Sequence, residues 1–445
     1  GDFKQVYAQG VDTNGNFIWS QTTGIVLAEV FGSQEFPKIS VRNTDRENQY
    51  FIGWTDFRDI SDPDIYGQLI VDGEKQWSDE GVQISSRDGQ DEMTDVVENF
   101  YIWQGWIGTS HKNIFIKMID ENGNTPAGWP EDGLEICAAE GNQGNAKGIL
   151  VPEGILVIWE DKRNGNLDIY GQLVTPAGNI LWQEDGVPLV LLDNDQEPSN
   201  FIYDDDIFMT WSDFRNGNDY DVYMQKYDNT GSELWTENGL EIAVKDSAQV
   251  YPYLVQSGDY FITFFEDYYY STAAHPNSDL YAQMVDMEGN LQWDTEGYEI
   301  CSAIKNQSKP QATTDNSNNV YVIWQDTRSS GKTDIYNIYA QKLFDSTAVA
   351  NDFELEKSIE IRNYPNPFRN STEISFNLNV ESMTNPEINI YNIKGQIVNT
   401  LKPEENKIIW DGKNAAGKTV SSGIYFYRLE ADDHKSGTRK MVVLR

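Results

Sequence analysis

The chain has 445 residues, of which 71 are Asp or Glu and 33 are Lys or Arg, so its formal net charge is −38. So acidic a chain is repelled by nucleic acids and by anionic membrane surfaces, which argues against both as partners. No stretch approaches 18 consecutive apolar residues, so no membrane span is predicted. Residues 352–445 hold 13 basic and 13 acidic residues, and the whole net charge therefore lies in the first 351 residues. This acidity is typical of a solvated surface outside the cell.

An internal repeat organises the first part of the chain. Its skeleton is W-x-D-x-R, a short polar turn and then D-[IVL]-Y-x-Q, and it is clearest at residues 211–225. Six copies, two of them degraded, recur at spacings of roughly 50 to 60 residues, a period typical of propeller blades. The intact copies contain Trp54, Asp56 and Arg58; Trp159, Asp161 and Arg163; Trp211, Asp213 and Arg215; and Trp324, Asp326 and Arg328.

Each repeat is predicted to form four short strands, and no helix is predicted anywhere. The second strand is a nearly continuous apolar run that ends at the Trp, as at 155–159, which suits a strand buried on both faces. Asn-Gly and Ala-Gly hairpins follow the third strand, because they supply positive φ at low cost. We therefore predict an all-β chain with a six-bladed β-propeller over residues 1–343, and seven blades as the alternative.

The charged residues of the repeat are interpreted as architecture. Side chains two apart on a strand share a face, so Trp, Asp and Arg of W-x-D-x-R point the same way. We expect the Trp to wedge between blades and the Asp to accept hydrogen bonds from the Arg fork beside it. The alternative is a ring of Arg residues that binds an anion, but each Arg has its own Asp two residues earlier.

The two ends of the repeat region are expected to meet. Residues 1–27 have the features of the back half of a repeat, and residues 307–343 those of the front half. Joining them would make a sixth blade and close the ring. The chain offers seven third-strand candidates for six blades, however. Either the copy at 3–11 or at 334–343 is an extra edge strand, or a seventh blade exists in the precursor.

Candidate ligand-binding residues lie where the repeat departs from its own pattern, in the second and fifth copies. Aromatic residues gather there, and aromatic-rich loops suit sugar stacking or protein contact. Ordinary drift with packing is the alternative. The candidates are Trp103, Trp106, Tyr268, Tyr269 and Tyr270.

No catalytic site or metal site is predicted from motifs. The three His residues lie in different segments without paired metal spacing, and no nucleophile elbow or phosphate loop is present. Carboxylates are too numerous for a glycosidase pair to be singled out. The Asn- and Asp-rich turns, such as 164–168 and 216–221, are interpreted as turn chemistry, with Ca²⁺ binding as the alternative and no other cofactor expected. Cys137 and Cys301 occupy equivalent places in different repeats and are predicted to be free thiols.

The composition changes after the repeats. Residues 344–357 are predicted to be a linker, and residues 358–445 a small immunoglobulin-like β-sandwich of about seven short strands.

This last region also carries a resemblance. The motifs N-Y-P-N-P-F, I-Y-N-I-K-G-Q, W-D-G-K-N-A-A-G-K and K-M-V-V-L-R occur in order. They resemble the type A C-terminal sorting domain of the type IX secretion system. The resemblance implies a Bacteroidetes-like source, export across the outer membrane and, in many relatives, removal of the domain on export. It also implies recognition by the secretion machinery through the last strand, Lys440, Met441, Val442, Val443, Leu444 and Arg445.

These features favour a secreted or cell-surface binding or structural protein, acting in adhesion, in glycan or protein interaction, or in surface assembly. An extracellular polysaccharide hydrolase or lyase on a propeller scaffold is the alternative.

Overall fold

The computed structural model describes the chain except residues 1–2, 13–14, 20–22, 44–47, 269–276, 329–335, 346–360, 377–385, 393, 395, 404–405, 432–438 and 445. The described residues form strands and no helix, so the prediction of an all-β chain is confirmed. Within these residues no helix is long and apolar enough to cross a membrane. The chain divides into two units, Gly1–Thr347 and Ala348–Arg445. Most of the predicted linker lies outside the described residues.

The first unit is a series of antiparallel sheets in chain order. A two-stranded sheet opens it, five sheets of four or five strands follow, and a three-stranded sheet ends it. The strands are β1 (Tyr7–Ala8) and β2 (Ile25–Val26); β3 (Gln34–Asn43), β4 (Asn48–Asp56), β5 (Asp64–Val71), β6 (Glu74–Lys75) and β7 (Val82–Gln83); β8 (Asp91–Val97), β9 (Phe100–Ile107), β10 (His111–Met118) and β11 (Leu134–Cys137); β12 (Gln143–Val151), β13 (Gly154–Asp161), β14 (Asp168–Val174) and β15 (Val187–Val190); β16 (Gln196–Asp204), β17 (Asp206–Asp213), β18 (Asp221–Tyr227) and β19 (Leu240–Ala243); β20 (Gln249–Ser257), β21 (Tyr260–Asp267), β22 (Asp279–Asp286) and β23 (Tyr298–Cys301); and β24 (Gln307–Thr314), β25 (Asn319–Asp326) and β26 (Asn337–Asp345).

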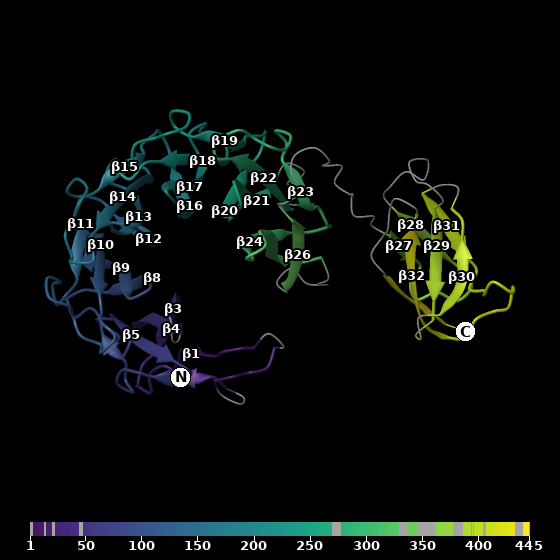
Figure 1. The fold of residues 1–445 in the computed structure, drawn as a ribbon, viewed down its shortest axis with the longest axis horizontal. Helices are drawn as coiled ribbons and strands as arrows, with labels where there is room; N and C mark the ends of the chain where they lie inside the picture. Colours follow the sequence, from purple (N-terminus) through teal and green to yellow (C-terminus); the bar gives the residue numbers. More distant parts are fainter. Residues whose placement is uncertain are drawn as a thin grey trace. The chain divides into compact units, whose positions relative to one another are not determined.

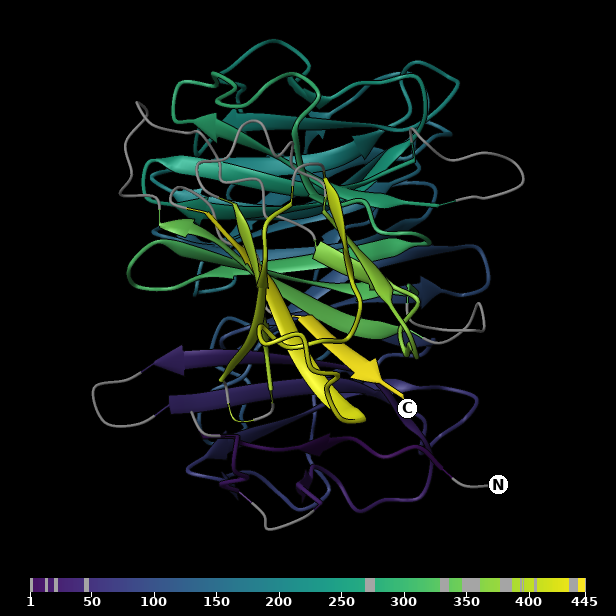
Figure 2. The same cartoon turned by 90° about the vertical axis from the view of Figure 1, so that its right-hand side faces the viewer.

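Consecutive sheets lie side by side along an arc, as blades do in a propeller (Figure 1). The first strand of each sheet is innermost, and β3, β8, β12, β16, β20 and β24 contact one another in this order. Figure 2 shows the sheets of this unit stacked, from the purple N-terminal strands at the bottom to the teal strands at the top. The inner strands of successive repeats therefore lie next to one another.

The two ends of the arc do not join into one sheet. Among the described residues β1 pairs only with β2, and β26 pairs only with β25, so the expected joining of the two half-repeats is wrong. Both β1 and β26 carry Tyr-x-Gln, at Tyr7 and Tyr339. They are equivalent third strands and cannot complement each other as two halves of one blade. The number of blades stays a prediction.

The W-x-D-x-R residues form the same network in every intact copy. At the end of β13, Trp159 Nε1 donates to Asp161 Oδ2 at 2.9 Å, and Arg163 Nη2 donates to the same oxygen at 2.6 Å. The Arg163 guanidinium also lies 3.9 Å from the ring centroid of Tyr170. Equivalent Trp–Asp and Asp–Arg bonds occur around Asp56, Asp213 and Asp326. The Asp–Arg contact expected from the sequence is thus present in all four copies.

The Trp residues fill the layers between sheets. Trp159 is fully buried and clusters with Phe100 and Ile102 of the preceding sheet. The glycine before the fourth strand allows this packing, because a Cβ on Gly186 would lie 2.5 Å from Trp159 Cη2, and its φ is +88°. The same clash recurs for Gly133 against Trp103. This glycine is therefore fixed both by its backbone conformation and by the Trp beside it.

A second set of Trp residues joins neighbouring sheets. Each lies after the hairpin between the third and fourth strands and donates its indole N–H to the equivalent hairpin of the next sheet. The bonds are Trp77 to the Glu121 oxygen at 3.0 Å, Trp129 to Pro176 at 3.0 Å, Trp182 to Asn229 at 3.0 Å and Trp235 to Met287 at 3.3 Å. These bonds fix the outer spacing of the sheets, and with it the inner space.

The second unit consists of two sheets that share one core. The sheets are β27 (Ile361–Tyr364), β28 (Thr372–Phe376) and β31 (Lys407–Trp410), and β30 (Ile397–Leu401), β29 (Glu387–Tyr391), β32 (Gly423–Glu430) and β33 (Arg439–Val443). Ile374 and Trp410 of the first sheet cluster with Ile390, Tyr427 and Met441 of the second. This is a two-layer sandwich, as expected; its likeness to an immunoglobulin domain stays a prediction.

Candidate functional site

Backbone irregularities gather on the innermost strands. The ladder to the second strand shifts register in β3, β12, β20 and β24. At each shift a residue with a side chain takes a left-handed conformation: φ is 52° at Phe36, Asn145 and Tyr251, and 53° at Lys309. Such a conformation costs about 1–3 kcal/mol for a residue other than glycine and clusters at functional sites. Bulges of this kind redirect side chains. Here the bulges lie on the strands at the inner edges of the sheets.

A pocket of about 460 Å³ lies where these bulges meet, and we call it the axial pocket. The innermost strands of five successive sheets, β3, β8, β12, β16 and β20, all line it. Two aromatic side chains in its wall are unusually exposed, Phe36 at 48% and Tyr251 at 59%. Its polar lining consists of Lys38, Glu92, Thr94, Gln104, Asn145, Lys147, Glu160, Glu197, Ser199 and Ser212.

The three carboxylates of the axial pocket are held by hydrogen bonds. Glu160 Oε2 accepts from Asn145 Nδ2 at 2.8 Å. Glu92 Oε2 accepts from Gln104 Nε2 at 2.7 Å and pairs with the ammonium of Lys112 at 3.1 Å. Glu197 Oε1 accepts from the Tyr220 hydroxyl at 2.9 Å. The carboxylates are therefore oriented before any ligand arrives.

Glu160 has an altered acidity. Burial raises the pKa of Glu160 to about 7, the bond from Asn145 opposes this, and the charge of Glu197 raises the pKa further. The pKa of Glu160 therefore lies well above the ordinary value of a glutamate side chain.

The variable position of W-x-D-x-R supplies much of this site. Because side chains alternate along a strand, x points away from Trp and Asp. At this position Gln104 Oε1 accepts a hydrogen bond from the backbone N–H of Asn145 at 3.0 Å, and Ser212 Oγ accepts one from the backbone N–H of Tyr251 at 3.3 Å. Thr55 and Glu266 bind the N–H groups of Met93 and Lys309 in the same way, at 2.9 and 2.8 Å. These four x residues thus hold the innermost strand of the next sheet, whereas Glu160 accepts from Asn145 of its own sheet.

None of the residues of the axial pocket is among the candidates predicted from the sequence. A usable signal exists, since x is polar in all six copies: Thr55, Gln104, Glu160, Ser212, Glu266 and Gln325. A polar residue kept inside an apolar strand indicates a role on the opposite face.

The predicted aromatic candidates lie elsewhere. Trp103 is fully buried and stacks on Phe115 with centroids 5.8 Å apart, so its ring is not available to a ligand. Trp106 is half-buried in β9 with the Lys112 ammonium 5.4 Å from its ring. Tyr268 follows β21 in a non-adjacent sheet and donates its hydroxyl to Glu266 Oε2 at 3.2 Å.

The structure therefore does not bring Trp103 and Trp106 together with Tyr268, and none of the three lines the axial pocket. Tyr269 and Tyr270 lie outside the described residues.

Asn side chains of the acidic turns bind the neighbouring carboxylates. Asn164 and Asn166 donate their amides to the two oxygens of Asp168 at 2.8 and 3.0 Å, and Asn216 donates to Asp221 at 2.9 Å. In the part of the chain that the structure describes, no group of three or more His, Cys, Asp or Glu residues is placed to hold a metal ion. Ca²⁺ binding stays an untested expectation.

Both cysteines are free. Cys137 is buried, its thiol accepts from Arg163 Nη2 at 3.1 Å, and burial raises its pKa to about 12. A thiol with so high a pKa is a structural group and not a nucleophile.

Comparison with known proteins adds little for the first unit. No curated protein matches the chain. Solved structures similar to it include an alpha-L-arabinofuranosidase from Fusarium graminearum, at 10% identity and a TM-score of 0.35, covering 77% of this chain and 97% of that one. An endo-1,4-beta-xylanase from Bacteroides thetaiotaomicron has 11% identity and a TM-score of 0.32, with coverages of 55% and 86%. TolB from Acinetobacter baumannii has 15% identity and a TM-score of 0.33, and the match covers 65% of this chain and 60% of that one. These TM-scores are too low to carry an argument about activity.

The second unit gives a specific match. Residues 362–444 match the family of the secretion system C-terminal sorting domain. The match covers the motifs noted above except the final Arg445, and such a domain interacts with the secretion machinery. The predicted export is thereby confirmed: the chain is a type IX secretion cargo protein with a C-terminal sorting domain, destined for the cell surface or the medium.

Proposed function

We propose that this exported protein binds a glycan in the axial pocket. The observation that carries the proposal is the pair of exposed rings, Phe36 and Tyr251, held at left-handed backbone positions in the wall of a pocket that also presents oriented carboxylates. An exposed aromatic ring at a strained position has no evident role in packing.

The chemistry of the lining suits a carbohydrate. Aromatic rings pack against the C–H faces of a sugar, while carboxylates and amides bind its hydroxyl groups. Lys38 and Lys147 stand in the same wall as Glu92, Glu160 and Glu197, so the pocket does not present one sign of charge alone. The axial pocket is concave, unlike a protein–protein interface, and its volume of about 460 Å³ lies in the range of small-ligand pockets.

Replacing Tyr251 with Ala is expected to weaken glycan binding about tenfold, or about 1.4 kcal/mol, because the stacking surface is lost. Tyr251→Phe keeps the ring and should bind within about twofold of wild type. Isothermal titration with xylan, arabinan and mixed-linkage glucan, all neutral polysaccharides, provides the measurement. Equal affinity of wild type and Tyr251→Ala for every glycan that binds would rule out the axial pocket as the site.

A second function, hydrolysis of the bound glycan, is favoured by one observation. Burial raises the pKa of Glu160 to about 7, and Glu197, which accepts a hydrogen bond from Tyr220, is a second carboxylate in the same pocket. Two carboxyl groups in different environments are the requirement for glycosidic bond cleavage, one as the acid and one as the base or nucleophile. In this reading Glu160 protonates the leaving oxygen, and Glu160→Gln abolishes release of reducing ends while binding persists.

The acidity of Glu160 also predicts a pH-dependent stability. Its folded-state pKa of about 7 lies above the ordinary value of 4.5, so its contribution to stability is full below pH 4.5 and is lost as the pH rises through 7. Glu160→Gln stays neutral, and its free energy of unfolding relative to wild type should therefore rise between these pH values. Urea unfolding at several pH values tests this, with the exposed Glu74→Gln as control; parallel pH profiles for wild type and Glu160→Gln would contradict the assignment.

A further inference from the structure

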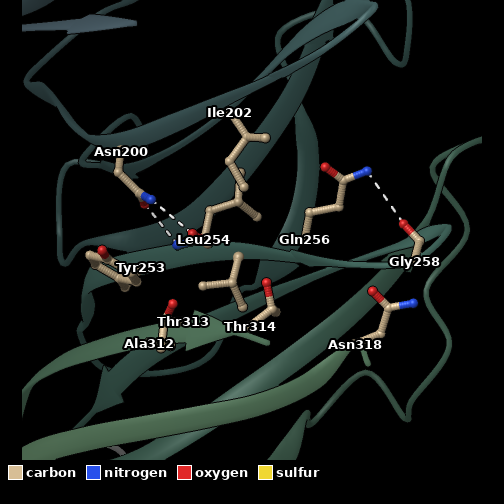
Figure 3. Close-up of a pocket in the computed structure, with 11 residues that line it drawn as sticks. Asn200, Ile202, Tyr253, Leu254, Gln256, Gly258, Ala312, Thr313, Thr314 and Asn318 are labelled. Atoms are coloured by element: carbon tan, nitrogen blue, oxygen red, sulfur yellow. Dashed lines mark hydrogen bonds between the residues drawn. The ribbon is translucent and has the colours of Figure 1, made fainter. Parts of the chain in front are cut away.

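A second pocket, of about 600 Å³, lies between the innermost strands β16, β20 and β24, and we call it the neutral pocket (Figure 3). Its lining carries no charged side chain, although it belongs to the region that holds the net charge of −38. Amide and hydroxyl groups line it together with aromatic and aliphatic surface, among them the side chains of Asn200, Tyr253, Gln256, Thr313, Thr314 and Asn318.

The neutral pocket continues the axial pocket along the same strands. Ser199 lines the axial pocket and Asn200 the neutral one, as neighbours on β16. On β20, Pro252 lines the axial pocket and Tyr253 the neutral one. One residue of a strand advances about 3.3 Å, so the two linings follow each other directly.

The strand edges in the neutral pocket are suited to polar ligands. β20 and β24 pair only with β21 and β25, so their other edges stay outside any ladder. Asn200 already binds such an edge, donating to the Leu254 oxygen at 2.8 Å and accepting from its N–H at 2.7 Å (Figure 3). The hydroxyls of Thr313 and Thr314 form no hydrogen bond to another described residue, and so are available to a ligand.

Resting on the proposed glycan-binding function, we propose that the ligand is a linear, neutral glycan chain that occupies both pockets in succession. Several sugar units would extend from Tyr251 along β16 and β20 to Thr313. The neutral pocket offers hydroxyl and amide partners for sugar hydroxyls and the ring of Tyr253 for C–H faces. It offers no cation for a uronate or sulfate group, and the acidic surface of the unit disfavours such chains.

Titration with linear xylo-, arabino- and gluco-oligosaccharides of increasing length tests this inference. We expect affinity to rise about tenfold from the disaccharide to the hexasaccharide. Thr313→Arg, which fills the neutral pocket from an exposed position on β24, should remove this gain and leave the disaccharide affinity unchanged. Thr313→Ser is the matched control and should keep the gain.

The outcomes separate this inference from the proposed function. Two results would overturn the proposal that one chain occupies both pockets, while leaving glycan binding in the axial pocket intact. One is an affinity that does not depend on chain length, and the other is a gain in affinity with length that persists in Thr313→Arg. Stronger binding of oligogalacturonate than of any neutral chain overturns the assignment to neutral glycans. Failure of every oligosaccharide to bind wild type removes the proposed function itself.

Discussion

Deletion of residues 440–445 is expected to abolish delivery to the cell surface and to leave the protein in the periplasm. The deletion removes most of β33, whose Met441 and Val443 are fully buried in the core of the sorting domain. It also removes the bonds that tie this strand to Phe368, whose N–H donates to the Val442 oxygen at 3.0 Å and whose oxygen accepts from Leu444 at 2.8 Å. Cell fractionation with surface proteolysis measures the effect, and surface delivery at the wild-type level would contradict it.

A second variant separates recognition from folding. Lys440 and Leu444 are exposed, the latter at 39%, so replacing both with Ala leaves the core intact. If the machinery reads the outer surface of this strand, the double variant should lose surface delivery while its thermal unfolding is unchanged. Ile409→Ala alters a more exposed apolar residue, on β31, and should be exported normally.

The substitution Asp161→Ala is expected to lower the free energy of unfolding of the first unit by about 3–5 kcal/mol. Asp161 is fully buried and accepts from the Trp159 indole at 2.9 Å and from the backbone and guanidinium of Arg163 at 2.9 and 2.6 Å. Its loss leaves the buried indole N–H without an acceptor and removes the anion that pairs with the partly buried guanidinium, which keeps only neutral acceptors in Cys137 and the Asp185 oxygen. This costs more than the mean value of a hydrogen bond.

Urea unfolding followed by tryptophan fluorescence measures this loss. Asp259→Ala changes an exposed carboxylate in the turn between β20 and β21 and should shift stability by no more than about 0.5 kcal/mol. A similar small shift for Asp161→Ala would mean that the repeated Trp–Asp–Arg network does not stabilise the sheets.

The repeated part of the fold could be predicted from the sequence because its physics is local. Trp159, Asp161 and Arg163 are two residues apart on one strand, so alternation alone places them on one face. The turn before Gly186 and the apolar run of β13 are likewise read from neighbouring residues. Closure of the arc was mispredicted because Tyr7 and Tyr339 mark equivalent strands, and similarity of pattern does not establish hydrogen-bonded pairing.

The axial pocket could not be predicted in the same way. Phe36, Glu160 and Tyr251 lie in three different sheets and meet only because the inner strands converge. The left-handed positions of Phe36 and Tyr251 are indicated only by the Pro that follows each, which disfavours a helical conformation but does not specify positive φ. The residues around Trp103, in contrast, depart from the repeat pattern, yet Trp103 itself fills the same interior position as Trp159.

The most direct test of the central claim is a crystal structure of the protein soaked with a neutral oligosaccharide that binds in titration. Our account predicts a sugar ring against the Tyr251 side chain, with hydroxyl groups within hydrogen-bond distance of Glu160 or Glu197. An empty axial pocket at saturating oligosaccharide, with the ligand bound only on the outer hairpins of the sheets, would contradict it.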